Sequence, residues 1–298
     1  MIIAVTGSSG LIGSALVADL EANGHLVRPV VRRLVREEKH EIHWDPTSGT
    51  IDAAEFAGVD AVVHLAGENL AAHRWTPQFK EKILTSRVNG TKLLCDTLAA
   101  LAAKPTVLVS ASAIGYYGNR GDERLDESSP PGHSFLASVC QQWEAATLPA
   151  RDADIRVVNL RIGVVLSTNG GALTQMLTPF KLGLGGVVGS GQQYLSWITL
   201  EDVVRAIQFV LHAAALTGPV NAVAPEPVTN REFTKTLGRI LKRPTIMAMP
   251  AAAARLAFGE MADEMLLCSA RVEPHALATA EFSFERPQLE PALKHLLT

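Results

Sequence analysis

The chain is poor in the residues that mark several common protein classes. It has only three cysteines among its 298 residues, Cys95, Cys140 and Cys268, and their spacing is not typical of a metal site. Aromatic residues make up 5 %, and the 27 basic residues are nearly balanced by 30 acidic ones. The net charge of −3 offers no basic surface for a nucleic acid. We therefore expect reduced thiols, no bound metal and no nucleic-acid partner.

Long apolar runs and a basic leader are also missing from the sequence. No apolar stretch is long enough to span a bilayer, and "MIIAVTG" is apolar from its second residue, with no basic segment before it. With 47 % apolar and 19 % charged residues, the chain has enough apolar material for a sizeable core. These features predict a cytoplasmic protein that has no membrane partner.

The first thirty residues predict a nucleotide-binding unit. A short apolar run at residues 2–5 is followed by glycines at positions 7, 10 and 13, by apolar residues at helical spacing, and by a second apolar run at 26–31. Glycines between a strand and a helix let the backbone approach a pyrophosphate, which the N–H groups at the helix start attract. The predicted cofactor-binding residues of this turn are Gly7, Ser9, Gly10, Leu11, Ile12 and Gly13.

The end of the second predicted strand indicates which nucleotide is bound. An acidic residue there would accept hydrogen bonds from the 2′-hydroxyl of a ribose, whereas arginine would pair with a 2′-phosphate. The sequence has Arg32 and Arg33 at this point and no acidic residue. We therefore predict NADP(H) as the cofactor.

Further apolar runs alternate with helical patterns along the chain. Strands are expected within 58–69, 105–118 and 154–166, another at 43–46, and helices at 77–102 and 134–147. Such alternation predicts an α/β fold, a Rossmann doubly wound parallel sheet whose ligand crevice lies at the carboxyl ends of the strands. The third run ends in a small-residue turn, and its predicted cofactor-binding residues are Leu65, Ala66, Gly67 and Glu68.

The last third of the chain changes character. Residues 169–196 are rich in glycine, and helices are expected after the caps Thr199 and Thr229 and over 250–268. We expect 1–166 to form the NADP-binding Rossmann domain, with 197–224 returning to it. Residues 167–196 and 225–298 would form a smaller, discontinuous C-terminal substrate lobe.

Several segments together resemble a known family. In order, they are "LAGENL" (65–70), "SASAIGYYG" (110–118), "FLASVCQQWE" (135–144), "RIGVVL" (161–166) and "FGEMADEMLL" (258–267). They are similar to the YfcH-like or SDR39U1-like epimerase-family proteins of the extended, atypical short-chain dehydrogenase/reductase superfamily, which end in a small domain of unknown function. The resemblance implies an oxidoreductase or nucleotide-sugar-epimerase-like enzyme acting on a small polar substrate, as a monomer or homodimer.

The catalytic set that the superfamily uses is incomplete here. Its Y-x-x-x-K-x-x-x-E pattern aligns with Leu136, Cys140 and Glu144, so the tyrosine and the lysine are both replaced. The supporting asparagine position holds Arg87, and only Ser112 remains. By this resemblance, Ser112 is predicted to be catalytic.

Three interpretations of this loss stay open. Tyr116 or Tyr117, just after Ser112, could act as the acid, with Arg87 supplying the missing cation beside the cofactor. The proton could instead come from water, from the substrate or from Glu68. The protein could also bind NADP(H) without turnover, as a regulatory or cell-division-related protein. Arg161, after the strand at 154–166, is a further candidate for cofactor contact.

Overall fold

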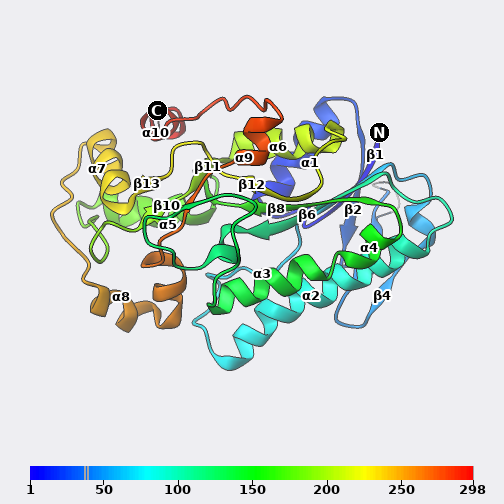
Figure 1. The fold of residues 1–298 in the computed structure, drawn as a ribbon, viewed down its shortest axis with the longest axis horizontal. Helices are drawn as coiled ribbons and strands as arrows, with labels where there is room; N and C mark the ends of the chain where they lie inside the picture. Colours follow the sequence, from blue (N-terminus) through cyan, green and yellow to red (C-terminus); the bar gives the residue numbers. More distant parts are fainter. Residues whose placement is uncertain (37, 39, 298) are drawn as a thin grey trace. The chain divides into compact units, whose positions relative to one another are not determined.

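The computed structural model describes residues 1–36, 38 and 40–297, and the chain divides into two compact units (Figure 1). The first unit comprises Met1–Ser112, Val139–Leu160 and Val204–Val220. The second comprises Ala113–Ser138, Arg161–Val203 and Asn221–Thr298. The boundaries predicted for the Rossmann domain and the substrate lobe stay a prediction.

The first unit is built on a sheet that, among the described residues, has eight strands in the order β12-β8-β6-β5-β1-β2-β3-β4. Successive pairs from β3 through β2, β1 and β5 to β6 are parallel, and β4 is antiparallel to β3. The strand order reverses at β1, which is the doubly wound Rossmann arrangement that the sequence predicted. The strands are β1 Ile2–Thr6, β2 Leu26–Val31, β3 Ile42–Asp45, β4 Thr50–Ile51, β5 Ala61–His64, β6 Val107–Ala113, β8 Arg156–Ile162 and β12 Gly218–Ala222.

Helices cover both faces of this sheet. Figure 1 shows α1 (Leu11–Ala22) on one face and α2 (Pro77–Ala100) with α4 (Leu148–Asp152) on the other. The central strands are buried on both sides, which explains why they are continuously apolar and not alternating. Helices α3 (Phe135–Ala145) and α6 (Leu200–His212) each pass from one unit into the other along the chain.

The second unit has its own core around the fully buried Trp197, whose indole N–H donates to the Glu226 carbonyl at 3.1 Å. Its strands form three short two-stranded sheets, β9 with β11, β10 with β13, and β7 with β14. The elements are η3 Ile114–Tyr117, β7 Arg124–Leu125, β9 Val164–Leu166, α5 Gly171–Lys181, β10 Tyr194–Leu195, β11 Trp197–Thr199, β13 Val228–Thr229, α7 Asn230–Leu241, α8 Ala251–Phe258, η4 Ala262–Leu266, β14 Arg271–Val272, α9 His275–Thr279 and α10 Leu289–Leu297.

Two predicted elements differ from those observed, and one observed helix was not predicted. The run at 154–166 is two strands, because the chain leaves the main sheet at Gly163, where a Cβ would lie 2.7 Å from the Ser196 carbonyl oxygen. The predicted helix at 250–268 ends at Gly259, whose φ of +63° stops α8, and a π-helical turn, η4, follows. Helix α5 was not predicted, since Pro179 and the surrounding glycines hid its apolar spacing.

Both predicted helix caps are confirmed. Thr199 accepts the backbone N–H of Asp202 at 3.1 Å, at the start of α6. Thr229 and Glu232 form a reciprocal capping box at the start of α7. Within the described part of the chain, no helix is both long and apolar enough to cross a membrane.

Candidate functional site

A cavity of about 910 Å³ opens in the first unit where the strand order reverses. Much of its lining comes from β2 and from the loops that follow β1, β2 and β5, which are neighbours at the centre of the sheet. The lining includes Gly7, Ser8, Ser9, Gly10, Arg32, Arg33, Leu65, Ala66, Gly67 and Glu68. The glycine turn, the two arginines and the small-residue turn therefore meet at one place, the switch point at which such sheets bind ligands.

The glycine turn after β1 has no room for side chains. Gly7 has a φ of +66°, and a Cβ there would lie 2.8 Å from the Leu65 carbonyl carbon. A Cβ on Gly13 would lie 2.1 Å from the Gly7 carbonyl oxygen. Gly10 begins α1 and no side chain caps the helix, so its first N–H groups are left for another acceptor. This backbone cradle fits the pyrophosphate of a dinucleotide.

The two arginines after β2 have different partners. Arg33 binds both carboxylate oxygens of the buried Glu41, through Nη1 at 2.7 Å and through Nη2, and also donates to the Leu34 carbonyl. These bonds hold the pKa of Glu41 below its usual value. Arg32 is exposed, and its side chain has no hydrogen-bond or ion-pair partner among the residues that the structure describes. Of the two, Arg32 is the cation still available to a ligand.

The turn after β5 is held from two sides. Thr6 Oγ1 accepts the backbone N–H groups of Leu65 and Ala66 at 3.1 and 3.2 Å. On the other side, Arg87 Nη2 donates to the Glu68 carbonyl at 3.0 Å, and its guanidinium carbon lies 5.1 Å from the Trp143 ring centroid. Burial lowers the pKa of Arg87, which as an arginine keeps its charge at neutral pH. Arg87, the predicted cation, therefore contacts the turn at residues 65–68.

Ser112 lies near the end of β6 and is buried. Its hydroxyl donates to Glu144 Oε1 at 2.7 Å, across to α3. Leu136 and Cys140, on the same helix, are both buried. Cys140 also lies close enough to Arg87 for the two to interact electrostatically.

The two candidate tyrosines lie in the second unit and differ in access. Tyr117 is fully buried, and its hydroxyl donates to Asn221 Oδ1 at 2.7 Å and accepts from Arg161 at 3.0 Å. Burial raises its pKa to about 12. Tyr116 is only partly buried, with the Arg161 guanidinium carbon 3.4 Å from its ring centroid. Arg161 therefore contacts the rings of both tyrosines.

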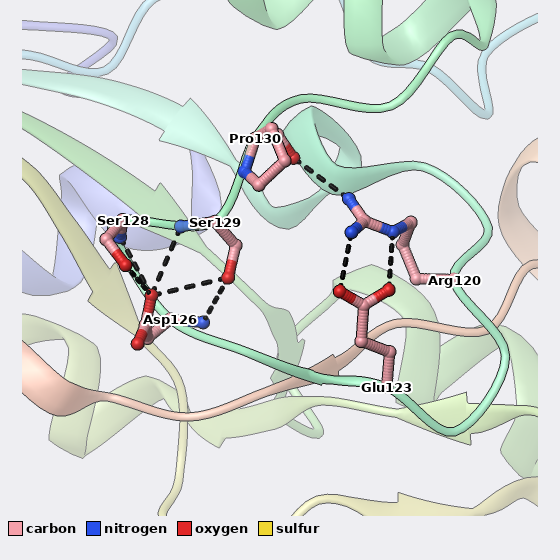
Figure 2. A network of polar contacts seen from close by, with 6 residues as sticks. All are labelled: Arg120, Glu123, Asp126, Ser128, Ser129 and Pro130. Atoms are coloured by element: carbon pink, nitrogen blue, oxygen red, sulfur yellow. Dashed lines mark hydrogen bonds and ion pairs between the residues drawn. The ribbon is translucent and has the colours of Figure 1, made fainter.

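The segment that follows the tyrosines is held by a network of polar contacts, as Figure 2 shows. Asp126 Oδ1 accepts from the backbone N–H and hydroxyl of Ser128 and from those of Ser129. Arg120 binds Glu123 through two nitrogens and donates to the Pro130 carbonyl at 3.0 Å. This loop leads directly into the start of α3.

The start of α3 is capped by a residue far along the chain. Glu264 accepts the Ser134 hydroxyl at 2.8 Å and the backbone N–H groups of Phe135 and Leu136 at 3.1 and 3.0 Å. A carboxylate at this position complements the positive end of the helix. No local pattern in the sequence predicts this contact.

The predicted site residues thus fall into three groups. Gly7, Ser9, Gly10, Arg32, Arg33 and residues 65–68 line one cavity, while Leu11, Ile12 and Gly13 form the start of α1 beside it. Arg87 contacts that cavity's wall, and Ser112 is paired with Glu144 in the same unit. Tyr116, Tyr117 and Arg161 gather in the second unit. Thr6, Thr91 and Trp143 were not predicted as site residues, and in the sequence His64 is only a polar residue that ends an apolar strand.

Comparison with known proteins gives consistent results. Residues 3–222 match the model of the NAD dependent epimerase/dehydratase family, and residues 249–296 match a domain of unknown function, DUF1731. The chain is 48 % identical to epimerase family protein Mb2239 of Mycobacterium bovis over 297 residues, which cover 100 % of this chain and 98 % of that protein.

Two solved structures are also similar. The human epimerase family protein SDR39U1, crystallised with NADPH, has 35 % identity and a TM-score of 0.91, with 99 % of each chain covered. A nucleoside-diphosphate sugar epimerase from Corynebacterium glutamicum has 38 % identity and a TM-score of 0.82, covering 100 % of this chain and 58 % of that one.

Proposed function

Because this chain belongs to the NAD dependent epimerase/dehydratase family, we propose that it binds NADP(H) and acts as an oxidoreductase or epimerase-like enzyme on a small polar molecule. The observation that carries the proposal is the cavity at the switch point of the sheet. Its lining includes the glycine cradle and Arg32, a cation that has no partner among the described residues. The NADPH in the structure of the human relative supports the choice of cofactor. NADP(H) would supply or accept a hydride at this site.

The 2′-phosphate is assigned to Arg32. Arg33 already pairs with the buried Glu41 carboxylate, and its displacement would leave that carboxylate with only the Arg36 backbone N–H as a partner among the described residues. Arg32 is exposed and lines the cavity, and it binds no buried carboxylate in the part of the chain that the structure describes. A charge-assisted hydrogen bond from a guanidinium to a phosphate contributes roughly 1.5–3 kcal/mol.

The remaining cofactor contacts follow from the loops around the cavity. The N–H groups at the start of α1 hold the pyrophosphate, and the backbone of residues 65–68 lies beside the ribose. Arg87 provides the positive charge that the superfamily draws from a lysine, here replaced by Cys140. Since arginine does not deprotonate, Arg87 stabilises charge and transfers no proton.

Tyr116 is the better of the two candidates for the general acid. Donation of a proton by Tyr117 would break its bond to Asn221 inside an apolar core, and its raised pKa disfavours the phenolate that would form. Tyr116 is partly exposed, and among the described residues its hydroxyl is not committed to a buried partner such as Asn221; the Arg161 guanidinium carbon lies 3.4 Å from its ring centroid. Ser112, whose proton is donated to Glu144, can accept a hydrogen bond from a substrate hydroxyl.

A second candidate function is cofactor binding without turnover, in a regulatory protein. The observation that favours it is the replacement of the usual tyrosine and lysine by the buried Leu136 and Cys140. Ser112→Ala and Tyr116→Phe separate the two functions. If the protein is an enzyme, both variants should lose turnover. If it is a regulatory protein, both variants should keep their cofactor-dependent binding of a partner.

The first experiment is calorimetric titration of the protein with NADPH, NADP⁺ and NADH. We expect NADPH to bind much more tightly than NADH, and Arg32→Ala to weaken NADPH binding by about 10- to 150-fold with little effect on NADH. Arg36→Ala is the matched control, because Arg36 is an exposed arginine of the same loop that does not line the cavity. Absence of binding by all three nucleotides would overturn the proposal.

A further inference from the structure

A chain of buried hydrogen bonds passes through His64 and connects α3 to the turn after β5, at residues 65–66. His64 is fully buried at the end of β5; its Nδ1 lies 2.7 Å from Thr6 Oγ1 and its Nε2 lies 2.9 Å from Thr91 Oγ1. Thr91, on α2, also accepts the indole N–H of Trp143, on α3, at 2.9 Å. All four side chains belong to the first unit.

The donors around Thr6 decide which nitrogen of His64 carries the proton. Thr6 Oγ1 already accepts two backbone N–H groups, from Leu65 and Ala66, and a hydroxyl oxygen has two lone pairs. If His64 donated from Nδ1, three donors would face those two lone pairs and the Thr6 proton would be left over. If Thr6 donates to Nδ1, every group on its oxygen is satisfied. His64 is then neutral, with its proton on Nε2 directed at Thr91.

This assignment gives His64 a role in the site. The Thr6 hydroxyl can keep both lone pairs on the Leu65 and Ala66 amides only while its own proton is directed at an acceptor elsewhere. Those two residues line the cavity. Without the acceptor, the hydroxyl would rotate to donate to another group. The Ala66 amide would then lose its fixed partner, and the Leu65 amide would keep only its longer bond to the Thr6 carbonyl, at 3.4 Å.

We propose that His64 is a positioning residue, which accepts the Thr6 proton at Nδ1 and thereby holds the turn at residues 65–66 in the shape that binds the cofactor. The proposal rests on the proposed NADP(H) binding and deepens it. His64 itself makes no contact with the cavity, since it is not among the lining residues.

Two substitutions that each keep one of the two bonds test the proposal. His64→Asn places an amide oxygen near Nδ1 and keeps the acceptor for Thr6, whereas His64→Gln extends its amide to the position of Nε2 and keeps only the contact with Thr91. Both remove one hydrogen bond from the same buried residue. We expect the Gln variant to bind NADPH roughly tenfold more weakly than the Asn variant, which should stay within about threefold of the wild type.

Two further measurements keep the proposal testable if a variant folds poorly. The ¹⁵N NMR signals of the wild-type imidazole should be those of the Nε2–H tautomer; the Nδ1–H tautomer would overturn the proposal. Amide hydrogen exchange at Leu65 and Ala66 should be faster in the Gln variant than in the Asn variant, whether or not a nucleotide binds. Equal NADPH affinity of the two variants would also overturn it. If the wild type binds no nucleotide, the proposed function fails, and the tautomer and exchange measurements still decide the role of His64.

Discussion

At the scale of single residues, the cavity depends on glycines, because a side chain at Gly7 or Gly13 would collide with the neighbouring backbone. Gly13 is buried against the glycine turn, and Gly13→Ala would place a methyl group 2.1 Å from the Gly7 carbonyl oxygen. The start of α1 and the turn must then move apart, at a cost of about 1–3 kcal/mol. We expect a lower melting temperature and loss of NADPH binding, measured by thermal unfolding and calorimetry. Ser14→Ala, an exposed neighbour on the same helix, should leave both unchanged.

His64 also predicts how stability responds to acid. Complete burial lowers its pKa to about 4, from an ordinary value of 6.5. As the pH falls from 6.5 to 4, the unfolded chain takes up a proton at this residue and the folded chain does not. The free energy of unfolding should therefore fall by roughly 3 kcal/mol across this window, at about 1.4 kcal/mol per pH unit.

Urea unfolding of wild type and His64→Asn across this pH range checks the prediction. The variant should show a distinctly shallower decline, whereas His73→Asn, at an exposed histidine, should follow the wild type. Parallel curves for wild type and His64→Asn would contradict it.

At the scale of single elements, α3 depends on a residue of the domain of unknown function. Glu264 accepts three hydrogen bonds at the first turn of α3. Glu264→Gln keeps the shape but removes the charge that these donors and the helix end stabilise, at a cost of about 1–3 kcal/mol. We expect faster amide exchange at Phe135 and Leu136.

The neighbouring Asp263 supplies the control for this prediction. It belongs to the same element and pairs with the exposed Arg255 at 2.9 Å, and among the described residues it makes no hydrogen bond to α3. Asp263→Asn removes the same charge and should leave exchange at residues 135–136 unchanged. If both variants accelerate amide exchange at residues 135–136 equally, the effect comes from the change in net charge and not from the loss of the cap.

The elements differ in how well the sequence predicted them. The strands of the central sheet were predictable, because full burial on both faces makes them short, continuous apolar runs. The helix starts at Thr199 and Thr229 were predictable because their caps lie within four residues of sequence. Glu264 could not be predicted as a cap, since its partners lie about 130 residues away. Arg33 was predicted for the phosphate because its partner Glu41 is visible only once the loop is folded.

At the scale of the whole molecule, the cavity belongs to one unit only, so the cofactor should protect the two units unequally. A ligand at about 100 times its dissociation constant stabilises the state that binds it by about 2.7 kcal/mol. With NADPH, we expect slower amide exchange in Met1–Ser112, above all at residues 7–13 and 65–68, and little change in α7. Hydrogen exchange with and without NADPH measures this. Equal protection of both units would show that the second unit also responds to the ligand.

The sequence predicted the architecture better than it predicted the chemistry. The order of strands and glycines follows from local patterns, and the family match confirms the fold that they imply. The catalytic assignment stays a prediction, because the usual tyrosine and lysine are absent and no local pattern shows which group replaces them. Even the contrast between Tyr116 and Tyr117, adjacent in sequence, depends on contacts with Arg161 and Asn221 from distant segments.

The path of the chain through the two units also governs when each can fold during synthesis. The first unit takes its last strand from residues 218–220, and the second takes segments from between and after those of the first. A ribosome must therefore release more than two thirds of the chain before the central sheet can be completed. Until then, the edge of β8 that later pairs with β12 is unpaired. The nascent protein should for that time depend on chaperones, and slower translation of the first half should not help it fold.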